Sequence, residues 1–200
     1  MNLTSGVPPS RPPPPTLASF TDASMTIQWE LPTDTGFNSS DPSLLKEWSL
    51  EVDDGFTSDF VALYSTQAAT LSYTHVSVIL GRTYRYRVRA RNQFSWSEYS
   101  SPSNFSNKRV PGRPLSAPNN DASNRTSLNI RYDSVADHGG SPITSYNIYI
   151  GDGSGGPFSS PINNYLNLTF SSESLSLSPG KYYRLKYSAN NSLGESPHSA

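Results

Sequence analysis

The chain has 200 residues, of which 34% are hydrophobic and 16% are charged, and its formal net charge is −1. A charge so close to neutral argues against nucleic acid as the main partner, because phosphate neutralisation needs an excess of positive charge. The absence of cysteine excludes disulfides and thiolate metal sites. No apolar run approaches the roughly 20 residues needed to span a bilayer, so we expect no membrane span in this chain.

Short segments that alternate apolar and polar residues predict half-buried β-strands. Clusters of Gly, Pro, Asp and Asn separate these segments and indicate turns. The clearest predicted strands of the first half are 25–29, 48–52 and 84–92. The second half repeats them, in the same order and about a hundred residues later, as 128–132, 146–150 and 183–191. This repetition indicates a duplicated all-β unit.

Several spaced features of the two units resemble the fibronectin type III family. An aromatic residue stands in the second strand (Trp29, Tyr132) and another in the third (Trp48, Tyr146). Residues 177–183, Leu-Ser-Pro-Gly-Lys-Tyr-Tyr, resemble the corner that precedes the sixth strand of the family. The resemblance implies an all-β fold of two tandem seven-stranded fibronectin type III or immunoglobulin-like β-sandwiches.

The alternation also predicts which side chains lie between the two sheets of each unit. The predicted first core is Trp29, Trp48, Leu50, Val52, Tyr84, Tyr86, Val88 and Ala90. The predicted second core is Ile130, Tyr132, Tyr146, Ile148, Ile150, Leu166, Leu168, Phe170, Tyr183, Leu185 and Tyr187.

The repeat predicts the domain boundaries. Residues 1–11 resemble a last strand plus a linker, 12–110 form a first module, 111–114 form a linker, and 115–200 form a second module. We expect the second module to lack its own last strand, because nothing follows its sixth strand that corresponds to 104–111 of the first module.

The N-terminal segment resembles the strand that the second module lacks, and three explanations are open. The chain is one period cut from a longer array, or it is a fragment with an arbitrary boundary. Alternatively, Asn2, Leu3, Thr4 and Ser5 complete the last module of a neighbouring copy by strand donation. Head-to-tail donation of this kind would build a filament.

Arginines alternate with the apolar residues of the predicted strand 84–92, so Arg85, Arg87 and Arg89 line its outer face. Shortly after this strand, the chain reads Trp-Ser-Glu-Tyr-Ser. This stretch resembles the Trp-Ser-x-Trp-Ser motif of class I cytokine receptors, with Tyr99 in the second Trp position.

The second resemblance implies that the rings of Trp96 and Tyr99 interleave with the arginines. Guanidinium planes stack favourably on the faces of aromatic rings. The resulting ladder is interpreted as a device that stiffens the sheet, or alternatively as a surface that binds a protein or an acidic glycan. The weaker stretch 194–199 of the second module predicts no second ladder.

Asn-x-Ser/Thr sequons are sites of N-glycosylation in secreted proteins. The chain contains six of them, at Asn2, Asn38, Asn104, Asn124, Asn167 and Asn190. Their predicted positions in loops or on outward faces make covalent N-glycans an expected modification.

The sequence shows no pattern typical of an enzyme. The three histidines are scattered, and neither a nucleophile elbow, a phosphate loop nor a metalloprotease helix is present. We expect no cofactor or metal, and an extracellular or cell-surface structural or adhesion module whose partners are copies of itself or neighbouring modules. The alternatives are a receptor ectodomain that binds a protein ligand and an intracellular fibronectin III scaffold.

Overall fold

A computed structural model describes residues 6–67, 69–123, 127–159, 161–174 and 177–200. The chain divides into two compact units, unit 1 (Met1–Asn107) and unit 2 (Lys108–Ala200). Both consist of antiparallel strands, and two short 3-10 turns are the helical elements of the described ranges, η1 (Pro42–Leu44) and η2 (Ser172–Ser174). The predicted all-β fold of tandem fibronectin type III-like or immunoglobulin-like sandwiches is confirmed.

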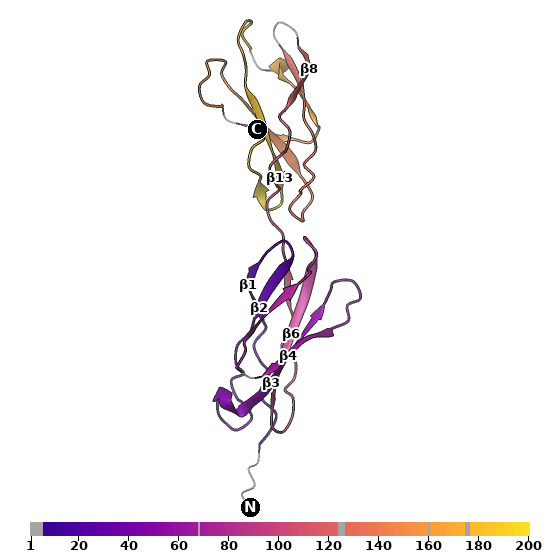
Figure 1. Cartoon of the computed structure of the whole chain (residues 1–200), viewed down its shortest axis with the longest axis vertical. Helices are drawn as coiled ribbons and strands as arrows, with labels where there is room; N and C mark the ends of the chain where they lie inside the picture. The colour runs from indigo at the N-terminus through magenta and orange to yellow at the C-terminus, as the bar shows by residue number, and fades with distance from the viewer. Residues whose placement is uncertain (1–5, 68, 124–126, 160, 175–176) are drawn as a thin grey trace, which may run out of the picture. The chain divides into compact units, whose positions relative to one another are not determined.

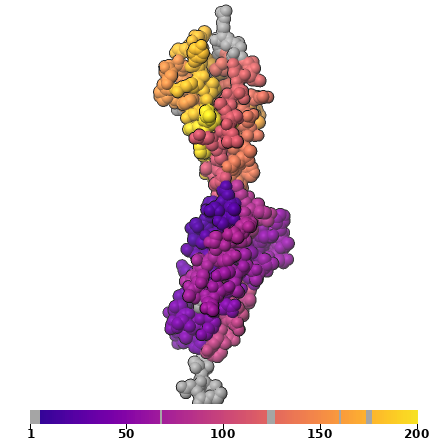
Figure 2. All heavy atoms as spheres, in the orientation of Figure 1, coloured from indigo at the N-terminus to yellow at the C-terminus, as the bar shows by residue number. Residues whose placement is uncertain are grey.

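Unit 1 pairs a three-stranded sheet with a four-stranded sheet (Figure 1). The first sheet has the order β1-β2-β5 and comprises β1 (Thr16–Phe20), β2 (Ser24–Gln28) and β5 (Ser72–Val76). The second has the order β4-β3-β6-β7 and comprises β3 (Leu45–Asp53), β4 (Val61–Gln67), β6 (Thr83–Asn92) and β7 (Ser103–Ser106). Most side chains of β1 are exposed, and the indigo atoms of this segment lie at the surface in Figure 2.

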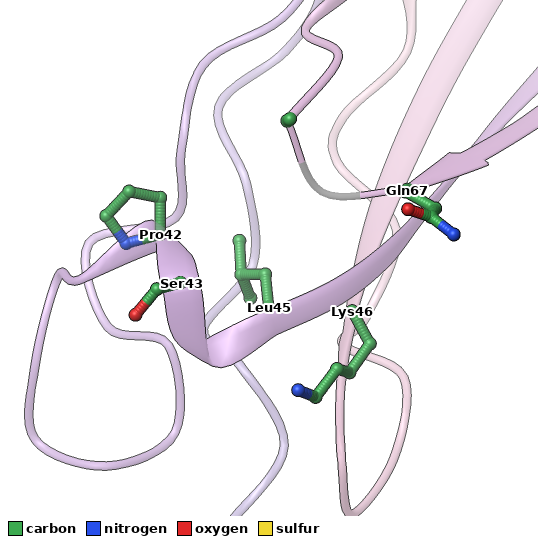
Figure 3. A pocket seen from close by; sticks show the side chains of 6 residues that line it. Pro42, Ser43, Leu45, Lys46 and Gln67 are labelled. Carbon is green, nitrogen blue, oxygen red and sulfur yellow. The ribbon is translucent and has the colours of Figure 1, made fainter.

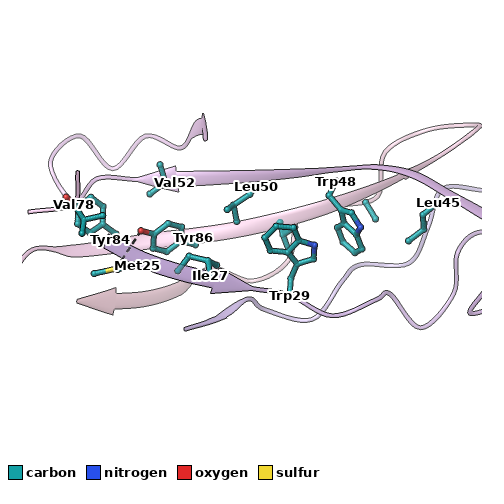
Figure 4. Close-up of a cluster of buried hydrophobic side chains, with 12 residues drawn as sticks. Met25, Ile27, Trp29, Leu45, Trp48, Leu50, Val52, Val78, Tyr84 and Tyr86 are labelled. Atoms are coloured by element: carbon teal, nitrogen blue, oxygen red, sulfur yellow. Dashed lines mark hydrogen bonds between the residues drawn. The ribbon is translucent and has the colours of Figure 1, made fainter. Parts of the chain in front are cut away.

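The core of unit 1 lies between these two sheets (Figure 4). All eight residues predicted for it are buried. Trp29, just after β2, and Trp48 of β3 reach toward each other from opposite sheets, with ring centroids 6.1 Å apart and planes tilted by 55°. Tilted aromatic pairs of this kind add about 0.5–1.5 kcal/mol to the stabilisation from apolar burial.

A histidine lies at the margin of this core and packs against two tyrosines. Nδ1 of His75 lies 2.8 Å from the hydroxyl of Tyr86, and its ring meets those of Tyr84 and Tyr86 edge-on. Burial disfavours the imidazolium and lowers the pKa of His75 below its usual value of 6.5.

We therefore expect unit 1 to lose stability as the pH falls. Because the folded pKa of His75 is depressed, the unfolded chain takes up the proton first, so stability is complete above pH 6.5 and declines as the pH drops toward the folded pKa. The slope should stay below about 1.4 kcal/mol per pH unit, because a single titrating group differs between the folded and unfolded states by at most one proton. Urea titrations at pH 5 to 8 measure it. His75→Gln should flatten the profile between pH 7 and 5, whereas His138→Gln, which alters an exposed histidine of unit 2, should not.

Unit 2 repeats the architecture of unit 1. Its three-stranded sheet has the order β12-β9-β8 and comprises β8 (Asn119–Ser123), β9 (Leu128–Arg131) and β12 (Thr169–Ser171). Its other sheet has the order β11-β10-β13-β14 and comprises β10 (Ser145–Ile150), β11 (Ile162–Tyr165), β13 (Leu185–Asn191) and β14 (Gly194–Glu195).

The core of unit 2 departs from the prediction at two leucines. Seven predicted residues are buried, and Tyr183 and Leu185 pack against them, but Leu166 and Leu168 are 78% and 38% exposed. The physical reason is that β12 begins only at Thr169, so the preceding residues form a loop. Tyr132 donates its backbone N–H to the carbonyl of Leu168 and its hydroxyl to the carbonyl of Asn167. The backbone of this loop therefore faces the core, and the leucine side chains do not.

The two units differ beside their sixth strands. In unit 1, β7 pairs with residues 83–86 of β6. In unit 2, β14 pairs with Asn190 and Asn191 of β13, and no strand within the described part of this unit takes the place that β7 has in unit 1.

The backbone segment that leads into the first strand of each unit, called the entering segment, is bound by equivalent hydrogen bonds in the two units. The backbone N–H of Val7 donates to the carbonyl of Gly36 at 3.0 Å, and that of Arg109 donates to the carbonyl of Gly139 at 2.9 Å. Both glycines have positive φ angles, 94° and 67°, and a Cβ on either would lie within 2.2 Å of the backbone of the entering segment. Only glycine allows the chain to pass so closely.

A buried asparagine at the end of the sixth strand completes each attachment. Nδ2 of Asn92 donates to the carbonyls of Val7 and Thr35, at 2.6 and 2.9 Å. Nδ2 of Asn191 donates to the carbonyls of Arg109 and His138, at 2.7 and 3.1 Å. Val7 belongs to the segment 1–11, which the sequence predicted as a last strand plus a linker, and Arg109 belongs to the end of the predicted first module.

Candidate functional site

The outer face of β6 carries the densest array of interacting polar side chains in unit 1. Along this strand, Tyr84, Tyr86, Val88 and Ala90 are buried in the core, and the intervening arginines point outward. Because strand side chains alternate between faces, the four arginines, Arg85, Arg87, Arg89 and Arg91, form one row.

Aromatic rings separate the arginines of this row. The guanidinium carbon of Arg87 lies 4.1 Å from the ring centroid of Phe60 and 4.0 Å from that of Tyr99. The guanidinium of Arg89 lies 4.5 Å from Tyr99 and 4.5 Å from Trp96. The stack Phe60–Arg87–Tyr99–Arg89–Trp96 is called the arginine–aromatic ladder. Each cation–π contact is worth about 0.5–2 kcal/mol, depending on desolvation.

Carboxylates of β3 face three of the four arginines. The register pairs Asp53 with Arg85, Glu51 with Arg87, and Glu47 with Arg91. The first pair forms an ion pair, and the other two have N–O distances of 2.6 and 3.3 Å. These cross-strand pairs join β3 to β6 on the face that lies away from the core.

The ion pairs also shift pKa values. The pKa of Asp53 is lowered, first because the backbone N–H of Gly55 donates to its carboxylate and then because Arg85 does. The pKa of Tyr99 is raised, mainly by burial and further by the carboxylate of Glu51, to which its hydroxyl donates. Asp53 is therefore ionised and Tyr99 protonated at neutral pH.

Two serines explain why the stretch Trp-Ser-Glu-Tyr-Ser can hold its rings over the arginines. Ser97 and Ser100 are buried, and their hydroxyls accept the backbone N–H groups of Ala90 and Val88, at 3.1 and 3.0 Å. Their own backbone N–H groups donate to the carbonyls of the same two residues, at 2.8 Å each. The serines thus fix this segment along β6 and leave the aromatic rings on the outer face.

The same serine arrangement recurs in unit 2. The hydroxyls of Ser196 and Ser199 accept the N–H groups of Ala189 and Tyr187, at 3.0 and 3.1 Å. The prediction that unit 2 has no second ladder is wrong, because a shorter stack of different composition is present.

The stack of unit 2 is built around Lys186. Its Nζ lies 4.5 Å from the ring centroid of Phe158 and 5.1 Å from that of Tyr149, and Arg184 also lies over Phe158 at 5.1 Å. The hydroxyl of Tyr149 donates to Glu195 at 2.6 Å. Burial and this carboxylate raise the pKa of Tyr149 to about 12.

Comparison with known proteins shows a likeness to solved structures. No protein-family model and no curated protein matches the chain. Among solved structures, the chain is similar to the crystal structure of chicken CNTN1 FN1-FN3 domains, with 19% sequence identity and a TM-score of 0.43. The match covers 97% of this chain and 65% of that one, so the chain spans less than two thirds of that fragment.

The sequons differ in how the structure presents them. Asn38, Asn104 and Asn167 are exposed. Asn190 is half-buried within β13, and its Nδ2 donates to the hydroxyl of Ser145 at 3.3 Å. Asn2 and Asn124 lie outside the described residues, and so do Leu3, Thr4 and Ser5, which complete the predicted strand-donating segment with Asn2.

Sequence reasoning missed three contributors to the ladders. Phe60 and Phe158 occupy equivalent loop positions, 98 residues apart, and this spacing within the repeat was the signal that could have found them. Arg11, far away in sequence, donates from Nε to the carbonyl of Tyr99 at 2.5 Å. No local sequence pattern predicts that contact, because the two residues are 88 positions apart.

The surface carries several open hollows. One, with a volume of about 600 Å³, lies between η1, the start of β3 and the end of β4 and is lined by Pro42, Ser43, Leu45, Lys46, Gln67 and Ala69 (Figure 3).

In the parts of the chain that the structure describes, no three His, Asp or Glu side chains gather as they would around a metal ion. The same parts contain no helix with the length and apolarity to cross a membrane.

Proposed function

We propose that this chain is a non-catalytic extracellular module pair with a structural or adhesive role, acting as a unit of a longer tandem array or filament. The observation that carries the proposal is the repeated attachment of the entering segment. Val7 and Arg109 are bound at equivalent places, by equivalent glycines and by Asn92 and Asn191. A module whose entering segment is hydrogen-bonded to the sandwich suits an array, because tension along the chain is then transmitted to the sandwich.

The arginine–aromatic ladder supports the same role. Its cross-strand ion pairs and ring contacts join β3, β6 and the segment of Trp96 to Tyr99 on the face opposite the core. Groups engaged with one another in this way hold a sheet together rather than transform a substrate. Partners of the chain are proposed to be copies of itself or neighbouring modules, with strand donation by residues 2–5 as one mode of contact.

N-glycosylation tests the extracellular setting. Expressed through the secretory pathway of eukaryotic cells, the protein is expected to carry N-glycans on Asn38, Asn104 and Asn167, because these side chains are exposed. Asn190 should stay unmodified, since it lies within β13 between β10 and β14. Intact mass before and after enzymatic removal of N-glycans measures occupancy, and single Asn→Gln variants assign each site. A mass that does not change on enzymatic removal would contradict the extracellular proposal.

A further inference from the structure

One arginine of the row on β6 has no carboxylate opposite it on β3. Asp53, Glu51 and Glu47 each face an arginine across the β3–β6 pair, but Arg89 faces Ser49. Within the described ranges, the guanidinium of Arg89 forms no ion pair and no hydrogen bond, and its Nε is buried without an acceptor. Its only described interactions are with the faces of Trp96 and Tyr99.

The ring contacts leave the hydrogen-bonding groups of Arg89 unused. A guanidinium donates in its own plane, whereas its two faces here are covered by aromatic rings. Unpaired polar groups of this kind are rare in folded proteins, and each requires an explanation. Because the stack blocks both faces, an acceptor can reach this guanidinium only edge-on, from the solvent side of the sheet.

A second arginine without a carboxylate partner among the described residues binds the backbone of Tyr99. Arg11 is exposed, donates from Nε to the carbonyl of Tyr99, and has no carboxylate partner among the described residues. The ring of Tyr99 thus stacks on Arg89 while its carbonyl binds Arg11, and neither guanidinium has a carboxylate partner among the described residues, whereas Arg85, Arg87 and Arg91 are paired. Planar guanidinium groups match the geometry of sulfate and carboxylate oxygens.

We infer that Arg89 and Arg11 form an anion-recognition site on unit 1 for an acidic glycan, whose sulfate or carboxylate groups pair with the guanidinium groups that have no carboxylate partner in the described residues. A glycan fits the site because the face is open rather than a pocket, so that only a chain bearing repeated charges can engage both arginines. The partly exposed rings of Trp96 and Tyr99 offer edges against which sugar rings can pack. The inference rests on the proposed extracellular setting for the source of the glycan.

Three variants with the same change in net charge test the site. Ser49→Glu supplies the missing carboxylate in cis while Arg89 and both rings stay in place. Arg89→Gln removes the unpaired cation, and Arg91→Gln removes a cation that is already paired with Glu47. Binding of the purified protein to immobilised heparin, a sulfated glycan, is measured at several salt concentrations, and folding is checked by thermal denaturation.

We expect Ser49→Glu and Arg89→Gln to weaken heparin binding about tenfold or more, which is the scale of one lost charge-assisted hydrogen bond. Arg91→Gln should change it less than about threefold. Because Ser49 is only 5% exposed, Ser49→Glu counts only if it melts as the wild type does; otherwise the comparison of Arg89→Gln with Arg91→Gln decides. Equal losses in all three variants, no binding by the wild type, or equal competition by poly-glutamate would each overturn the inference. Because the assay uses purified protein, these outcomes are independent of whether the sequons carry glycans.

Discussion

Replacing Trp48 with alanine is expected to lower the free energy of unfolding of unit 1 by about 3–5 kcal/mol, the usual cost of truncating a buried aromatic residue. Trp48 is fully buried, comes from the middle of β3, and packs across the core on Trp29. Its removal leaves a cavity between two sheets whose strands are held by backbone pairing on both sides, so little relaxation can fill it. A loss of this size is a large fraction of the stability of a typical domain, which is about 5–15 kcal/mol.

The measurement is urea unfolding followed by tryptophan fluorescence. All three tryptophans, Trp29, Trp48 and Trp96, lie in unit 1, so this signal reports unit 1 alone, and two of them remain in the variant. Leu115→Ala, at a position of unit 2 that is 95% exposed, is the control and should stay within about 0.5 kcal/mol of the wild type. A loss below about 1 kcal/mol in Trp48→Ala would show that the core is not packed as described.

Replacing Asn92 with aspartate should destabilise unit 1 by about 2–4 kcal/mol although the two side chains have the same shape. Nδ2 of Asn92 donates to the carbonyls of Val7 and Thr35, and its Oδ1 accepts the N–H groups of Phe94 and Ser95. Aspartate can still accept, but it presents an oxygen to two carbonyls. The substitution therefore turns two buried hydrogen bonds into repulsive contacts.

Asn191→Asp in unit 2 is the matched control for this experiment. It removes the equivalent donors to Arg109 and His138 but should leave the tryptophan-detected transition of unit 1 unchanged. Circular dichroism, which reports both units, should show the loss instead. If Asn92→Asp leaves the fluorescence transition where it was, the asparagine does not hold the entering segment, and the main support for a module of an array is lost.

The sequence by itself determined the two sandwiches and most of their cores. Period-two alternation decides which face of a strand is apolar, and burying that face is the dominant stabilising contribution to folding. For this reason all eight residues predicted for the first core are buried, from Trp29 to Ala90. The same alternation placed the arginines of β6 on the outer face.

Only the tertiary structure decided what those outer arginines meet. Phe60 reaches the ladder from the β3–β4 loop, Arg11 reaches it from the entering segment, and the register of β3 sets Ser49 rather than an acid opposite Arg89. Leu166 and Leu168 show the opposite case. Their alternation matched a strand, but Tyr132 binds the carbonyls of Asn167 and Leu168, and the two leucine side chains are exposed. Local pattern governs which side of a strand a residue occupies, whereas its partners are set by contacts between segments far apart in the chain.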